Sequence, residues 1–152
     1  HSNTSFYISS LSEGRHAIRA FPVKSWGESV KDPSAFSIVQ FYVKNNNSEL
    51  LNLNQPMLTY NGPVGFYKAE NAKRILLDFI VRNVVLGQTG YKVRYTLDGK
   101  ARELYSASPI YLTTLSAGKH NIVLELVDKS GNLAEGNFVR TQREFGVLED
   151  KK

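Results

Sequence analysis

Hydrophobic and polar residues alternate one by one along much of this 152-residue chain, which is the pattern of a strand with one buried face. In residues 119–128, Ile122, Leu124 and Leu126 fall on one side, and Gly131-Asn132 follows as a turn. Such regular alternation predicts a strand that ends at a tight turn.

Residues 91–99 show the same alternation and end in Asp98-Gly99, a dipeptide typical of hairpin turns. The side expected to face inward holds Tyr91, Val93, Tyr95 and Leu97, and the outward side holds Lys92, Arg94 and Thr96. This segment therefore predicts the first strand of a hairpin whose second strand covers residues 101–105.

The run "AKRILLDFIVRNVVL" is apolar on both of its sides. Ile75, Leu77 and Phe79 alternate as in a strand, but Leu76 and Ile80 make the opposite side apolar too. A short amphipathic helix is the alternative, and the β-branched and aromatic content favours a strand. Strands are expected near residues 57–60, 74–86, 91–98, 101–105, 109–114, 119–127 and 137–147, with three more in "FYISSL", "RHAIRAFPV" and "FSIVQFYV" nearer the start.

One stretch of the sequence occurs twice, 104 positions apart. Residues 6–18 match residues 110–122 with identity at Tyr, Leu, Ser, Gly, His and Ile, where chance would give about one identity. Further identical pairs are Val23/Val127, Gly27/Gly131, Phe41/Phe145 and Val43/Val147. This spacing predicts a duplicated unit of about 100 residues, a common domain size.

The repeat divides the chain into four parts. Residues 56–148 are expected to form a complete β-sandwich, since about seven strands in 100 residues is typical of that fold. Residues 1–43 correspond to the C-terminal strands of a second, truncated unit, 44–55 to a linker, and 149–152 to a charged tail. The strands that precede residues 1–43 in a full unit are expected to be cut away or supplied by another polypeptide.

The repeated segments "YLTTLSAGKHNIVLELVDKSGN" and "YISSLSEGRHAIRAFPVKSWGE" resemble a strand-loop-strand signature of tandem immunoglobulin-like or fibronectin-type domains in bacterial exported and surface proteins. The resemblance implies an all-β, immunoglobulin-like sandwich and a periplasmic, cell-surface or secreted location. The first copy departs from it in the turn, where Lys24, Trp26 and Glu28 differ from the second copy. A role for that turn is therefore not shared by the two copies.

Composition is that of a globular protein, with 41% hydrophobic and 22% charged residues. No run approaches the roughly 18 apolar residues of a membrane-spanning helix. The absence of cysteine excludes a disulfide scaffold and a cysteine-ligated metal. None of these properties points to a cofactor.

The sequence offers no catalytic constellation. It contains no G-x-S-x-G elbow, no H-E-x-x-H and no phosphate-binding loop, so we expect neither an enzyme nor a metal site. His120 recurs as His16 at the same position of the repeat, which favours a packing or hydrogen-bonding role over chemistry. The acidic residues Asp78, Asp98, Glu103, Glu125 and Asp128 are spread along the strands, as solvated carboxylates usually are.

Two groups of side chains are candidates for ligand binding. Lys92 and Arg94 lie on the outward side of one strand and, given the net charge of +5, could attract an anionic surface. Their strand places its aromatic residues inward, which argues against nucleic acid. The second group consists of the loop aromatics Trp26, Tyr60, Phe66 and Tyr67, which suit sugar stacking or protein contact. Covering the end of the sandwich is their alternative role.

Open strand edges in residues 5–43 predict a partner, because three strands with apolar faces are not stable alone. Pairing with another polypeptide, strand exchange between copies and docking on the complete unit are the alternatives. The sequence as a whole favours a non-catalytic structural, adhesion or ligand-presenting module of an exported bacterial protein. An accessory carbohydrate-binding domain of a secreted enzyme, or a subunit of a cell-envelope assembly completed by another chain, is the alternative function.

Overall fold

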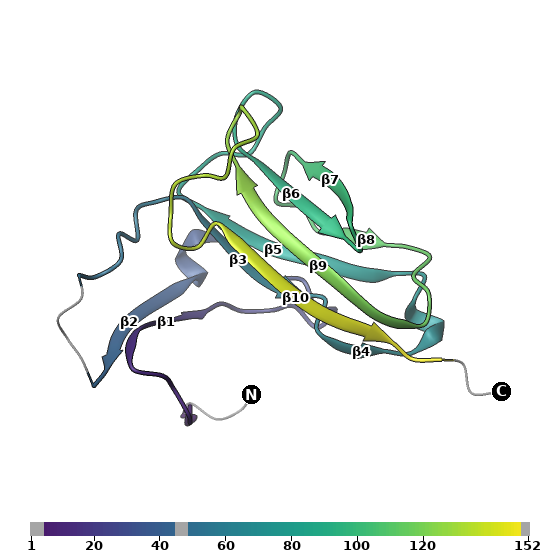
Figure 1. Cartoon of the computed structure of the whole chain (residues 1–152), viewed down its shortest axis with the longest axis horizontal. Helices are drawn as coiled ribbons and strands as arrows, with labels where there is room; N and C mark the ends of the chain where they lie inside the picture. Colours follow the sequence, from purple (N-terminus) through teal and green to yellow (C-terminus); the bar gives the residue numbers. More distant parts are fainter. Residues whose placement is uncertain (1–4, 45–48, 150–152) are drawn as a thin grey trace.

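The computed structural model describes residues 5–44 and 49–149, and these are all-β apart from two short 3-10 turns. Two sheets face each other in the larger part (Figure 1). The five-stranded sheet has the order β4 (Gly65–Tyr67), β10 (Arg140–Val147), β9 (Gly118–Val127), β6 (Lys92–Leu97) and β7 (Lys100–Leu104). The three-stranded sheet has the order β3 (Met57–Gly62), β5 (Ile75–Arg82) and β8 (Ile110–Leu112).

A single hydrophobic core lies between these sheets. Ile122, Leu124 and Leu126 of β9 are fully buried in it, together with Leu77 and Phe79 of β5. Both strands are those that the alternation of apolar residues predicts, so the strand interpretation of residues 74–86 is confirmed over Ile75–Arg82. The core is built by period-2 side chains from both sheets, which is the arrangement of a β-sandwich.

The segment that follows β3 changes from one sheet to the other. β3 pairs with β5 through Gly62, with a register shift between Tyr60 and Gly62. From Gly65, whose φ is 71°, the chain pairs with β10 in parallel. A positive φ suits glycine, which lacks a Cβ. We expected Phe66 and Tyr67 to lie in a loop, and that expectation is wrong because Gly65–Tyr67 form β4.

The N-terminal part forms a separate hairpin of β1 (Gly14–Ala20) and β2 (Ser37–Val43). His16 lies opposite Phe41 in it, as His120 lies opposite Phe145 in the β9–β10 pair. Matching backbone features also stand 104 positions apart. The φ angle is 60° at Ser10 and 59° at Thr114, and it is 114° at Gly14 and 123° at Gly118. The isolated β-bridge Val23–Ser29 likewise has a counterpart in Val127–Leu133. The β1–β2 hairpin and the β9–β10 pair therefore share one register.

Residues 6–11, expected to be a strand, do not form one. Phe6 is 72% exposed and Ile8 47% exposed, whereas the corresponding residues 110–112 form β8 and pair with β5. A strand needs a neighbour for its backbone hydrogen bonds, and no strand in the described part of the chain pairs with residues 6–11. The missing pairing partner explains why similar sequences differ in structure.

The connection between β1 and β2 lies against the outer side of β5. It includes the 3-10 turn η1 (Pro33–Ala35), whose Pro33 carbonyl accepts a hydrogen bond of 3.0 Å from Arg82 Nη1. Ile80, on the side of β5 opposite the core-facing residues, is buried. Docking of the N-terminal part on the sandwich thus accounts for a strand that is apolar on both sides.

Among the described residues, no helix has the length and apolar character needed to cross a membrane.

Candidate functional site

The most tightly bonded polar site lies where the N-terminal part meets β5. Asp78 is fully buried there, and its Oδ1 accepts a bond of 2.6 Å from Lys31 Nζ. Its Oδ2 accepts from the backbone N–H of Ser29 at 2.9 Å, from the Ser29 hydroxyl at 2.5 Å and from Asn61 Nδ2 at 2.7 Å. We call these four residues the Asp78 junction.

The Asp78 junction has the bonding that a buried charge requires. A carboxylate removed from water is costly unless it is paired and its lone pairs accept hydrogen bonds. Lys31 also donates to the Ser29 hydroxyl and to the Phe79 carbonyl, and Asn61 donates to the Gly27 carbonyl. Three separate segments of the chain are therefore joined through one carboxylate.

Sequence reasoning missed this site. It counted Asp78 among solvated carboxylates, which is wrong because the residue has no exposed surface. The available signal was the position of an acidic residue in a strand that is otherwise apolar on both sides. A charge at such a position requires a buried partner.

Arginines add further contacts between the N-terminal part and the sandwich. Arg19 Nη1 donates to the Leu58 carbonyl and to Thr59 Oγ1, both at 3.1 Å, and its guanidinium lies 4.6 Å from the centroid of the Phe138 ring. Burial, and secondarily the nearby Arg143, lower the pKa of Arg19. The guanidinium fits this place because it forms a planar stack on an aromatic ring while donating hydrogen bonds.

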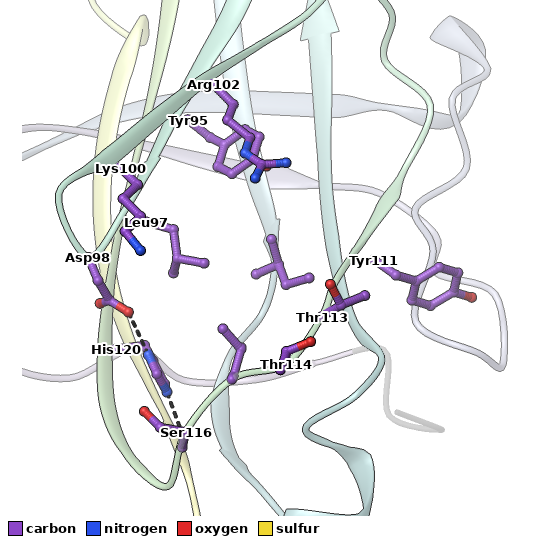
Figure 2. A pocket seen from close by; sticks show the side chains of 12 residues that line it. Tyr95, Leu97, Asp98, Lys100, Arg102, Tyr111, Thr113, Thr114, Ser116 and His120 are labelled. Carbon is purple, nitrogen blue, oxygen red and sulfur yellow. Dashed lines mark hydrogen bonds and ion pairs between the residues drawn. The ribbon is translucent and has the colours of Figure 1, made fainter.

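A second site is an open cleft of about 350 Å³ between the β6–β7 hairpin and β8 (Figure 2). His120 lies at one end of it, with Nδ1 2.7 Å from Asp98 Oδ2 and Nε2 2.9 Å from the Ser116 carbonyl. Burial by itself lowers the pKa of His120, but the hydrogen bonds to Asp98 and Ser116 outweigh it, so the pKa is raised. The same contact with His120, together with the Asn121 N–H, outweighs the burial of Asp98 and lowers its pKa.

Both nitrogens of His120 face acceptors, so the protonated ring donates from each of them. An imidazolium held in this way has no free nitrogen to act as a base. His16 repeats the arrangement in part: its Nε2 lies 2.8 Å from the Ser12 carbonyl, and its ring stacks on Phe41 as that of His120 stacks on Phe145. This geometry supports the packing and hydrogen-bonding role expected for both histidines.

Trp26 and Tyr67, two of the predicted ligand-binding residues, line a third hollow of about 450 Å³. Trp26 is 61% exposed, and Tyr111 stands in the same hollow with the Arg74 guanidinium 4.3 Å from its ring centroid. Asn61 and Asn71 also contribute to its lining. We call this the aromatic hollow; it combines ring faces with amide and guanidinium groups.

The other two predicted aromatics are not part of the aromatic hollow. The Tyr60 hydroxyl donates to the Pro63 carbonyl at 2.5 Å, and burial is the main cause that raises the Tyr60 pKa. Phe66 is exposed and its ring lies against Gly146, where a Cβ would come within 2.6 Å of the ring. Tyr60 packs beside the core, and Phe66 covers the β4–β10 edge.

Lys92 and Arg94, predicted as an anion-attracting pair, lie on β6 beside carboxylates. Lys92 Nζ is 3.2 Å from Glu103 Oε2, and Arg94 Nη1 is 3.7 Å from Glu125 Oε2 while Nη2 donates to the Gly131 carbonyl. Hydrogen bonds from Lys92 and from Tyr105 lower the pKa of Glu103. These ion pairs reduce the positive potential around Lys92 and Arg94, and neither residue lines the aromatic hollow.

Within the described parts of the chain, no group of three or more His, Asp or Glu side chains is placed to hold a metal ion. Asp128 uses its Oδ1 to accept from the N–H groups of Ser130 and Asn132 in its own turn. In comparisons with known proteins, no family model matches the chain, and no curated protein matches it.

Proposed function

We propose that this chain is a non-catalytic structural, adhesion or ligand-presenting segment of an exported bacterial protein. It consists of one complete immunoglobulin-like unit preceded by the C-terminal part of a second, homologous unit. The order of strands in the two sheets and the crossing from β3 to β4 support the immunoglobulin-like assignment. The shared register of the hairpins supports duplication. For a periplasmic, cell-surface or secreted location, the support is the resemblance of the repeated signature.

The observation that carries the structural role is the Asp78 junction. Neighbouring domains in a chain move relative to each other unless their interface is extensive. Here a buried carboxylate bonds at once to Lys31, Ser29 and Asn61, and each bond has a narrow range of favourable distance and angle. The N-terminal part is therefore held in one orientation, as a spacer or presenting module requires.

Spin-label distance measurements test this rigidity directly, because the chain lacks cysteine and labels can be placed at will. With labels at Val39→Cys on β2 and Lys100→Cys on β7, we expect one narrow distance distribution. Lys100→Cys paired with Glu144→Cys, both within the sandwich, gives the width for a rigid body. A distribution from the first pair much broader than this control would contradict the spacer role.

An accessory carbohydrate-binding function is the second candidate, favoured by the aromatic hollow. Sugars bind proteins through stacking on ring faces and hydrogen bonds to amide and guanidinium groups, and the hollow offers both. If this function is correct, a glycan array should give hits that Trp26→Ala weakens at least tenfold, the loss expected when a central aromatic contact is removed. Phe66→Ala, an exposed aromatic outside the hollow, serves as the control and should bind normally. Binding that is indifferent to Trp26→Ala would exclude the hollow as the glycan site.

A further inference from the structure

We propose that the hairpin β1–β2 carries an interaction surface for a polypeptide segment that supplies counterparts of β3 to β7. The surface, here called the open face, consists of residues that match core positions of the complete sandwich: Phe6, Ile8, Leu11, Ile18, Phe41 and Val43. Its partner has apolar side chains at the positions of Leu77, Phe79 and Val93. The proposal goes beyond a spacer role, because it concerns what completes the first unit.

Burial shows that the open face is unfinished. Ile8 is 47% exposed, whereas Leu112, which stands 104 positions later, is 4% exposed. Ile18 and Phe41 are only partly buried, whereas the corresponding residues of the sandwich lie in its core. Apolar groups that are equivalent in sequence and register thus lack the cover that their counterparts have.

The complete unit shows which elements provide that cover. β9 pairs with β10 on one side and with β6 on the other, and β8 pairs with β5. In the described residues β1 pairs with β2 alone, which leaves the edge equivalent to the β6 side of β9 unpaired. Residues 6–8 likewise lack the β5 counterpart. A segment equivalent to β3–β7 would fill both edges and cover the apolar side chains in one step.

The histidine of the hairpin adds a polar requirement. In the complete unit, Asp98 from the turn between β6 and β7 accepts from His120 Nδ1. His16 has the counterpart of the Ser116 contact, through Ser12, but the counterpart of Asp98 belongs to the segment that we propose. The partner is therefore expected to carry a carboxylate at the position of Asp98.

A second copy of this chain fits the open face less well. Its own β5 is already paired with β3 and β8, and its β6 with β9 and β7. The described strands of a second copy therefore include no free counterpart of β5 or β6. Two open faces packed against each other would bury apolar side chains. They would not supply a counterpart of β6, the strand that β1 needs along its free edge. The inference rests on the proposed duplication and does not require the Asp78 junction to be rigid. A broad spin-label distance distribution would therefore contradict the spacer role without affecting this inference.

The chain itself contains a surrogate for the partner, since the two units are related. A tandem protein carries an additional copy of residues 49–104 directly before His1, with the whole chain retained. If the graft pairs as in the complete unit, Tyr7 lies opposite Leu76 of the added copy, as Tyr111 lies opposite Leu76 in the original. Cysteines at Tyr7 and at the added Leu76 should then form a disulfide, and the amides of residues 6–8 should exchange at least tenfold more slowly than in the unmodified chain.

The control places the second cysteine at the added Ile80, four residues further along the strand and about 13 Å away, which is too far for a disulfide. The proposal is supported if Tyr7→Cys cross-links to the added Leu76→Cys and does not cross-link to the added Ile80→Cys. Equal cross-linking of both pairs, or none with unchanged exchange at residues 6–8, overturns it. Light scattering and hydrogen exchange on the unmodified chain provide a second test: a dimer with protected amides at residues 6–8 would show that the occupant is a second copy and would also overturn it.

Discussion

Replacing Asp78 with alanine is expected to lower the free energy of unfolding by about 3 kcal/mol, the lower end for breaking a buried ion pair because Lys31 keeps some contact with water. The substitution removes the counter-ion of the Lys31 ammonium and the acceptor of the Ser29 N–H. Residues 21–36 should then detach from β5 and become sensitive to protease. Urea denaturation measures the first effect and limited proteolysis the second.

A double-mutant cycle separates the ion pair from the loss of packing. Asp78→Leu combined with Lys31→Met removes both charges, so it should cost less than the sum of the two single changes. Such coupling is the signature of a charge left unpaired in each single variant. Unaltered unfolding of Asp78→Ala and unaltered proteolysis would show that the contact contributes nothing to docking.

The stability of the sandwich is expected to fall as the pH rises from 6 to 9. The pKa of His120 is raised in the folded state, so its contribution is fully present below the unfolded value of 6.5 and is lost as the pH rises through the folded value. Asp98 acts at the other end: its pKa is lowered, so its contribution is present above about 4 and is lost in stronger acid. Stability from this pair is therefore greatest between about pH 4 and 6.5.

His120→Gln should lower the free energy of unfolding at pH 6 by about 2 kcal/mol, since it removes a charge-assisted hydrogen bond from a buried position. It should also flatten the dependence of stability on pH between 6 and 9. Chemical denaturation at a series of pH values measures both. His16→Gln is the matched control, because it leaves the Asp98–His120 pair intact and should preserve most of the slope. A full slope in His120→Gln would assign the pH dependence to another group.

The parts of the fold that the sequence predicts are those with a complete periodic signal. β9 is an example, since Ile122, Leu124 and Leu126 alternate along it and all three lie in the core between the sheets. The strand expected over residues 74–86 was also predictable. The local sequence does not reveal why both of its faces are apolar. The cause is a second packing surface formed by residues distant along the chain.

Short or context-dependent elements could not be predicted in the same way. β4 has three residues and exists because β10 offers a parallel edge, which no local pattern encodes. Residues 6–11 have the composition of a strand but pair with none of the described strands. Of the predicted ligand-binding residues, Trp26 and Tyr67 line one hollow in the structure. Lys92 and Arg94 lie elsewhere, paired with Glu103 and Glu125. The alternation of polar and apolar residues does not reveal which carboxylate lies beside which cation.

The docking of the N-terminal part on the sandwich raises the problem of polymerisation if the two are related units, as we propose. A head-to-tail contact between related units can continue from molecule to molecule and build a fibre. In the complete unit, the positions equivalent to Ser29 and Lys31 hold Leu133 and Glu135. If a neighbouring copy had its own N-terminal part displaced, Glu135 would bring a second negative charge to Asp78 in the place of the Lys31 ammonium. This difference in charge would oppose the growth of a filament through the Asp78 contact.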